Sequence, residues 1–99
     1  MITVHAIVHA APEHREAYLE GLRGLQASTL ANDAGCLSYQ FYASIDDEHT
    51  FVCVEEWTDM DALRAHIEAP HHVAASAALD EFRDRPGELR VFESHPIDL

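Results

Sequence analysis

The segment FVCVEEW, residues 51–57, constrains the fold most strongly, because it begins with apolar side chains on both of its faces. Successive side chains of a β-strand point to opposite sides of a sheet, so Phe51 and Cys53 share one face while Val52 and Val54 share the other. Apolar area on both faces is stable only where both are removed from water. We therefore expect helices on one face of this strand and another chain on the other.

The segments on either side predict the remaining elements of the fold. Alternating apolar residues predict three further strands, and apolar residues at helical spacing predict two helical regions. The strands are expected at residues 2–10, 36–44 and 85–95, and the helical regions at about 12–31 and from residue 58 to about 83. The order β-α-β-β-α-β is that of the ferredoxin-like fold, an antiparallel sheet with helices on one face. We expect residues 1–99 to form one domain.

Three signals predict the ends and breaks of the helices. Pro12 suits the first turn of a helix, where the missing amide hydrogen is not needed. Thr58, with Asp61 three residues later, is typical of a capping box, with aspartate in place of the usual glutamate. Pro70 must interrupt the second helical region, which we expect to restart and continue over about 71–83.

The acidic composition excludes several classes of partner. The chain has 18 Asp and Glu residues against six basic ones, all arginine, and a formal net charge of −12. Such a surface repels phosphate groups, so we expect no nucleic-acid partner and no anionic membrane. The first segment resembles neither a signal peptide nor a membrane span, because His5 and His9 interrupt its apolar run. Without an export signal, Cys36 and Cys53 are expected to be a reduced pair in a cytoplasmic protein.

Glu55 is the residue that most needs a chemical explanation. It shares a strand face with Trp57, and if helices cover that face, a carboxylate there requires a partner or a raised pKa. The sequence does not fix which face is covered. We expect His66, on the following helix, to be the partner of Glu55, although an inert hydrogen-bonded histidine is the alternative. For Trp57 and Tyr39, ordinary packing in the core is the alternative to a role in a substrate pocket. His72 is expected to face solvent.

Eight histidines raise the question of a metal site. The spacing argues against one, because His66 and His71 are separated by five positions with Pro70 between them, whereas HExxH places its histidines four apart on an unbroken helix. His5 and His9 share a strand face but lie roughly 13 Å apart. Only convergence of distant residues in the folded chain would build a site. We therefore expect no metal and no cofactor.

A combination of short motifs then carries a resemblance to a known family. The chain contains AGCLSYQFYAS, FVCVEEW and TDMDALRAHIEAPHH, and a strand leading to a proline-initiated helix precedes them. Together these segments resemble the antibiotic biosynthesis monooxygenase domain family, in particular its small bacterial quinol monooxygenase-like members. The resemblance extends over roughly residues 2–93.

The resemblance implies a fold, an assembly and a reaction. It implies a dimeric α+β barrel of two ferredoxin-like chains, each with a pocket between its sheet and helices. It also implies oxidation of a quinol, phenolic or polyketide-like aromatic substrate by O₂ without flavin, haem or metal. On this basis His66 is expected to be the base and Glu55 to orient it. Trp57 is expected to stack on the substrate, with His71 at the rim of the pocket. Apart from the resemblance, Tyr39 is a candidate to contribute a hydroxyl to the pocket.

Departures from related branches narrow this expectation and leave alternatives open. Ser76 stands where haem-degrading relatives supply an axial histidine, and His5 stands where they have an asparagine, so haem degradation is disfavoured. The absence of lysine disfavours the phosphorylated ligand of an isomerase branch, although Arg64 and Arg83 remain. An isomerase or cyclase-like enzyme on the same scaffold stays open, as does a non-enzymatic dimer that binds a small aromatic metabolite.

Overall fold

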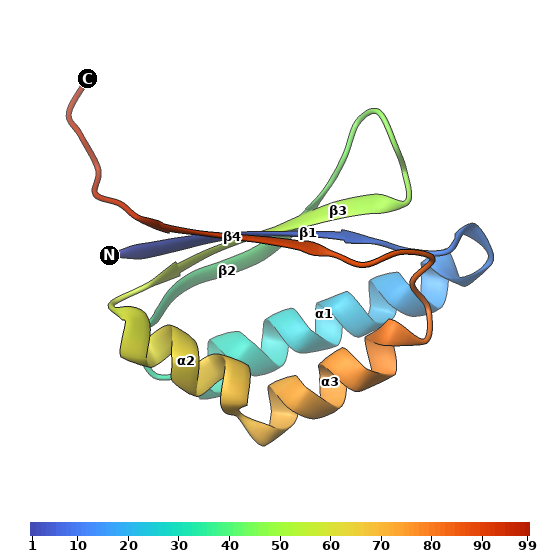
Figure 1. The fold of residues 1–99 in the computed structure, drawn as a ribbon, viewed down its shortest axis with the longest axis horizontal. Helices are drawn as coiled ribbons and strands as arrows, with labels where there is room; N and C mark the ends of the chain where they lie inside the picture. Colours follow the sequence, from blue (N-terminus) through green and yellow to red (C-terminus); the bar gives the residue numbers. More distant parts are fainter.

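A four-stranded antiparallel sheet forms one layer of the molecule, and this computed structural model describes all residues, 1–99 (Figure 1). The strands lie in the order β2-β3-β1-β4. They are β1 (Ile2–His9), β2 (Cys36–Ala43), β3 (Thr50–Trp57) and β4 (Glu88–Glu93). Every neighbouring pair is antiparallel, so the predicted ferredoxin-like sheet is confirmed. The strand with two apolar faces, β3, lies in the interior of the sheet.

The helices all lie on one side of this sheet and form the second layer (Figure 1). After the 3-10 turn η1 (Pro12–His14), α1 (Arg15–Asn32) runs the length of the layer. The second helical region is divided into α2 (Met60–Glu68) and α3 (Pro70–Asp80). Pro70 therefore breaks the region, as expected, and becomes the first residue of the new helix. No helix of the chain combines the length and apolarity needed to cross a bilayer.

The capping prediction for α2 was wrong. Asp59, not Thr58, is the N-cap, and its side chain accepts a hydrogen bond of 2.8 Å from the backbone amide of Ala62. Asp59 has extended backbone angles, which place its carboxylate over the amide of the third helical residue. The Thr58 amide instead donates to the Gly35 carbonyl at 2.9 Å. The chain between α1 and β2 is thereby attached to the start of α2.

Gly35 makes this attachment possible. Its φ is +80°, a region that residues with a Cβ atom rarely adopt. A Cβ atom at this position would lie 2.6 Å from the Cβ of Ala62 and 2.8 Å from Oγ1 of Thr58. The backbone of Gly35 therefore packs directly under α2. This contact brings the C-terminal end of α1 beside α2, which matters for the site below.

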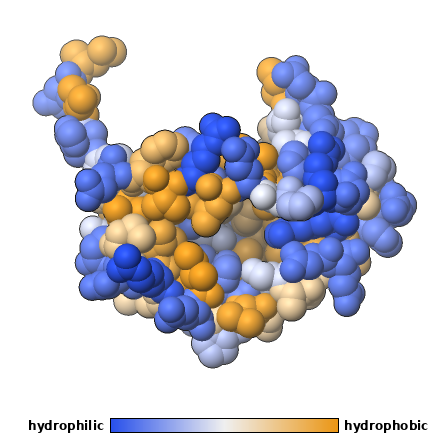
Figure 2. Space-filling model, viewed as in Figure 1, coloured by the Kyte–Doolittle hydropathy of each residue, from blue (hydrophilic) through white to orange (hydrophobic).

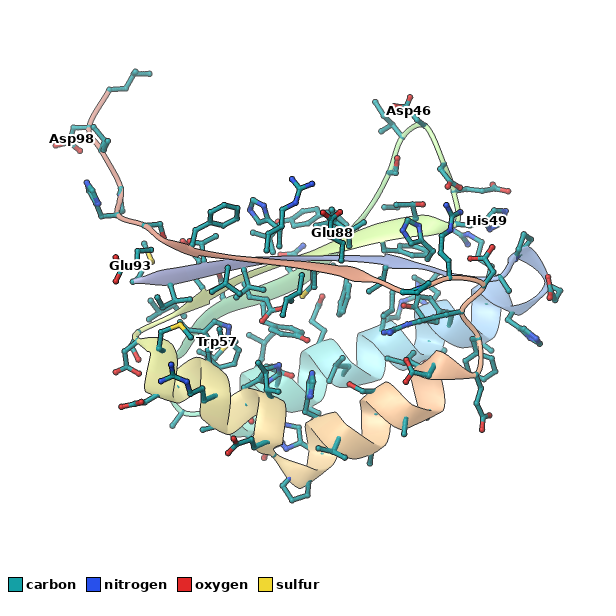
Figure 3. The ribbon with its side chains drawn as sticks, viewed as in Figure 1. Asp46, His49, Trp57, Glu88, Glu93 and Asp98 are labelled. Carbon is teal, nitrogen blue, oxygen red and sulfur yellow. The ribbon has the colours of Figure 1, made fainter.

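The structure decides which face of β3 the helices cover. Phe51, Cys53, Glu55 and Trp57 are all buried, whereas the residues between them are only half-buried. The Trp57 side chain lies between sheet and helices, and Glu88 projects from the opposite face (Figure 3). Glu55 is thus a carboxylate beneath a helical layer.

The other sheet face has no covering layer within this chain (Figure 1). Apolar and aromatic side chains nevertheless reach it from all four strands. By strand alternation and register, this open face carries, among others, Ile7, Tyr42, Val52, Val54 and Phe92. Tyr42 and Phe92 are 50% and 44% exposed in the single chain.

Candidate active site

A cavity of about 190 Å³ lies between the sheet and the helices. Most of the residues that line it are apolar, and they come from all four strands and from all three α-helices. Figure 2 shows apolar surface around a hollow on the side of the molecule where β4 faces α2 and α3. Ile67 and Leu89 line the cavity and are also partly exposed, which places them at its opening. The polar groups that line it are Tyr39, Glu55, His66, His72, Ser76 and Arg83.

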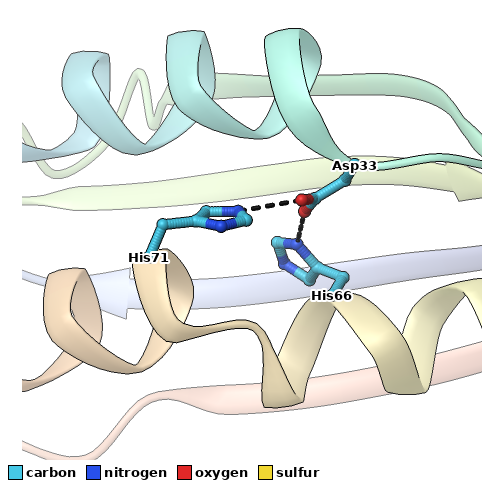
Figure 4. A group of neighbouring side chains, drawn as sticks. All are labelled: Asp33, His66 and His71. Atoms are coloured by element: carbon cyan, nitrogen blue, oxygen red, sulfur yellow. Dashed lines mark hydrogen bonds and ion pairs between the residues drawn. The ribbon is translucent and has the colours of Figure 1, made fainter.

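His66 is paired with Asp33, not with Glu55 as the sequence suggested. The Nδ1 atom of His66 lies 2.5 Å from Oδ2 of Asp33, and the two side chains are only 2% and 7% exposed (Figure 4). Asp33 is the C-cap residue of α1, and His66 is in the last turn of α2. Gly35 packs against Ala62, one helical turn before His66, and so holds the end of α1 beside α2, where the pair forms. In the sequence, residues 32–35 (NDAG) are typical of a helix end, and this local pattern gives no sign of a pairing with the distant His66.

Glu55 finds its partner on its own strand. Its Oε1 accepts a hydrogen bond of 3.0 Å from Nε1 of Trp57, and the residue is 4% exposed. Burial raises the pKa of Glu55 to about 7, against the opposing effect of hydrogen bonds from Trp57 and Cys53. The expectation that Glu55 is buried is therefore confirmed, but its hydrogen-bond partner is Trp57 and not His66. Near neutral pH this group changes between a hydrogen-bond donor and an acceptor.

Aromatic side chains surround the His66 ring. The centroid of Trp57 lies 4.6 Å from that of His66, and Tyr39 meets the same ring edge-on at 5.3 Å. Tyr39 lines the cavity, whereas Trp57 is fully buried and is not among the lining residues. Burial raises the pKa of the Tyr39 hydroxyl above its ordinary value. Both residues therefore fix the orientation of the His66 ring.

The two histidines at the start of α3 have different surroundings from those expected. His72 lines the cavity and its ring centroid is 4.3 Å from that of His66, so the prediction that it faces solvent was wrong. The reason is that α3 turns the side carrying His72, Ser76 and Leu79 toward the cavity, and not the side carrying His71. His71 instead does not line the cavity. Its Nε2 atom lies 2.9 Å from Oδ1 of Asp33, the carboxylate oxygen that His66 does not contact (Figure 4).

The pair of Asp33 and His66 has the arrangement of an oriented base. With Nδ1 bonded to the carboxylate, the Nε2 atom of His66 is left as the nitrogen able to accept a proton. Burial lowers the pKa of His66, and the hydrogen bond to Asp33 opposes this effect. A neutral imidazole held in one tautomer on an apolar wall is suited to take a proton from a bound hydroxyl group.

The two cysteines contribute no comparable chemistry. Both are free thiols, as the sequence predicted. Cys53 is fully buried beside Glu55, and burial raises its pKa above the ordinary value. Burial likewise raises the pKa of Cys36. A thiol with a raised pKa is a poor nucleophile at neutral pH.

Fold and site together define a class: a ferredoxin-like α+β protein with an apolar cavity between sheet and helices, and on the cavity wall a histidine that is paired with a carboxylate. Known proteins with similar sequences belong to the same class. The sequence model of the antibiotic biosynthesis monooxygenase family matches residues 1–78. "Putative monooxygenase YcnE" of Bacillus subtilis is 32% identical over 71 residues, which are 72% of this chain and 74% of that protein.

Solved structures give the same result over nearly the whole chain. A crystal structure of an antibiotic biosynthesis monooxygenase superposes with a TM-score of 0.89 at 26% identity and covers 97% of this chain and 100% of its own. Rv0793 of Mycobacterium tuberculosis superposes with a TM-score of 0.86 at 30% identity, covering 99% and 96%. The chain belongs to the antibiotic biosynthesis monooxygenase family.

Proposed function

We propose that this protein is a cofactor-independent monooxygenase that oxidises a quinol, phenolic or polyketide-like aromatic substrate with O₂. The observation that carries the proposal is His66 on the wall of an apolar cavity, with its Nδ1 atom bonded to Asp33 behind it. In this reaction Nε2 of His66 takes the proton of a substrate hydroxyl group. The resulting electron-rich anion then transfers an electron to O₂. For a quinol, one oxygen atom enters the ring as a hydroxyl group, the ring is oxidised to a quinone, and the second oxygen atom leaves as water.

The cavity supports a small substrate and a dry reaction. A cavity of about 150 Å³ lined by aliphatic and aromatic side chains is large enough for benzene. The 190 Å³ cavity of this chain is therefore suited to one aromatic ring with its substituents. Apolar walls hold a flat ring and keep water from a reactive anion.

The remaining site residues are assigned supporting roles. Asp33, not Glu55, is the residue that orients His66. Trp57 is a positioning residue, because it packs against the His66 ring and holds Glu55 by its indole hydrogen bond. Glu55 and Tyr39, which line the cavity, are proposed to contact the substrate oxygens. His71 does not line the cavity, and its Nε2 atom lies 2.9 Å from Oδ1 of Asp33.

We also propose that the open sheet face pairs with a second copy of this chain. The apolar and aromatic residues of that face support this assembly, because half-buried Val52 and Val54 and exposed Phe92 would then leave water. The free thiols agree with a cytoplasmic location. Light scattering after size-exclusion chromatography tests the assembly: a Val54→Asp variant is expected to elute as a monomer, and a monomeric unaltered chain would contradict it.

Oxygen uptake tests the reaction directly. The purified chain is supplied with single-ring and polycyclic hydroquinones in buffer free of flavin and treated with a chelator. We expect consumption of O₂ by the unaltered chain, and a loss of at least about 100-fold in kcat for His66→Ala, the contribution expected of a positioned general base. Asp33→Asn should also lower kcat, whereas His95→Ala, on an exposed histidine far from the cavity, should not. Unchanged turnover in His66→Ala would refute the proposed base.

A further inference from the structure

We propose that Asp33, His66 and His71 form a binding site for one divalent transition-metal ion of the Zn²⁺ class. Their ligand atoms, one from each side chain, all lie within 4.8 Å of one another. The three residues come from three helix ends: the C-cap of α1, the last turn of α2 and the first turn of α3 (Figure 4). This is the convergence of distant residues that sequence spacing does not reveal.

The distances are close to those of a coordinated ion. Around Zn²⁺, bonds of about 2.0–2.2 Å to nitrogen and oxygen place tetrahedral ligands about 3.3–3.5 Å apart. Here the two contacts of Asp33 with His66 and His71 are 2.5 and 2.9 Å. Each contact must open by less than about 1 Å, and the two imidazole nitrogens, which lie within 4.8 Å of each other, must come to the same separation. The ion would replace the proton that Asp33 and His66 share.

One donor atom is already without a partner. The Nε2 atom of His71 is buried and makes no hydrogen bond, because its 2.9 Å approach to Asp33 lacks hydrogen-bonding geometry. A buried polar atom of this kind is costly unless something binds it. A cation between the carboxylate and the two imidazole rings would satisfy this atom and the carboxylate together.

The surroundings favour a cation and give it access. A hollow of about 300 Å³ lies over the three residues, and its rim includes the exposed Asn32, Ala34 and Ala65. This hollow is separate from the cavity between sheet and helices, although His66 lines both. It leaves room for water as a further ligand. The C-termini of α1 and α2, which carry partial negative charge, meet there with the N-terminus of α3, which carries partial positive charge, so the helix ends together favour a cation. The net charge of −12 on the chain also attracts cations.

The donor set selects the class of ion. Two imidazole nitrogens and one carboxylate oxygen suit Zn²⁺, Co²⁺ and Ni²⁺, whereas Mg²⁺ and Ca²⁺ prefer oxygen ligands alone. Metal binding requires only these three side chains, so it stands independently of the oxidation proposed above. An ion on Nδ1 of His66 would leave the proton on Nε2, so the bound metal would inhibit that oxidation.

Calorimetric titration with ZnCl₂ tests the site, using the full chain stripped with a chelator and free of any affinity tag. We expect one Zn²⁺ per chain and no comparable binding of Mg²⁺. The visible absorption of bound Co²⁺ should show tetrahedral coordination. His71→Ala decides the question, because the His71 side chain is 29% exposed and its removal leaves the bond between Asp33 and His66 intact.

His71→Ala and Asp33→Asn should each weaken Zn²⁺ binding by at least about tenfold, since even outer partners of metal ligands are worth about 10- to 100-fold. The controls His72→Ala and His95→Ala remove imidazoles outside the ligand set and should bind Zn²⁺ as the unaltered chain does. Zn²⁺ should also raise the melting temperature of the unaltered chain but not that of folded His71→Ala. No saturable Zn²⁺ binding, or binding that both His71→Ala and Asp33→Asn retain, would overturn the proposal.

Discussion

Replacing Glu55 by glutamine should change how the stability of the protein depends on pH. Glutamine keeps an oxygen that accepts the hydrogen bond from Trp57, but it cannot ionise. Burial raises the pKa of Glu55 from the ordinary 4.5 to about 7, and the residue is only 4% exposed. Each pKa unit corresponds to about 1.4 kcal/mol, so ionising this carboxylate costs the folded chain about 3 kcal/mol. A whole domain of this kind is stable by only about 5–15 kcal/mol.

The direction follows from proton binding. Between pH 4.5 and about 7 the folded chain keeps the proton on Glu55 while the unfolded chain releases it. Proton release by the unfolded chain favours unfolding, so this group lowers the free energy of unfolding as pH rises through that range. Below pH 4.5 the group contributes no penalty, and above pH 7 the full penalty applies. Glu55→Gln should therefore gain stability relative to the unaltered chain as pH rises, by about 3 kcal/mol in all.

Urea unfolding of the two proteins at matched concentration, from pH 4.5 to pH 8, measures this difference. Trp57, the single tryptophan, reports unfolding by its fluorescence. Other groups titrate in the same range in both proteins, so the difference between the two free energies isolates Glu55. A difference that does not change with pH would refute the reasoning, because it would mean that Glu55 ionises in the folded chain as easily as in the unfolded one.

Three further predictions concern the helix ends and the metal. Gly35→Ala should lower the free energy of unfolding by about 2 kcal/mol or more, measured by urea unfolding, because its Cβ atom would be 2.6 Å from that of Ala62 at a φ of +80°; an unchanged stability would contradict the tight packing. Asp59→Ala should cost about 1 kcal/mol in thermal unfolding through loss of the α2 cap, and Thr58→Ala clearly less; the reverse order would restore Thr58 as the cap. Zn²⁺ should inhibit O₂ uptake and a chelator should restore it; binding of Zn²⁺ without inhibition would argue against His66 as the base, not against the metal site.

Much of the fold followed from patterns within single segments. Alternation in residues 51–57 predicted that Glu55 and Trp57 share a face and that both faces of β3 need cover, and strand order in the chain predicted the antiparallel sheet. Pro70 marked the break between α2 and α3. These features depend on neighbours in the sequence, which is why they could be predicted. The resemblance of short motifs to the antibiotic biosynthesis monooxygenase family was confirmed as well.

The predictions that were wrong concern the positions and contacts of individual side chains. Thr58 and Asp59 are adjacent and both are suitable caps, so backbone angles alone selected Asp59. The packing of α3 placed His72 on the cavity wall and His71 off it, whereas His71 was expected at the rim of the pocket and His72 in solvent. Asp33 was absent from the predicted site, because its pairing with His66 joins residues 33 positions apart.

By itself the sequence determined the strands and helices, the common face of Glu55 and Trp57, and the family, because these depend on local periodicity and on motifs read along the chain. The tertiary structure alone decided that the helices cover that face, and that Asp33, His66 and His71 meet at three helix ends. The physical reason is that contacts between elements depend on how they pack. Here a glycine with positive φ lets the end of α1 lie against α2 at a distance that no side chain would permit.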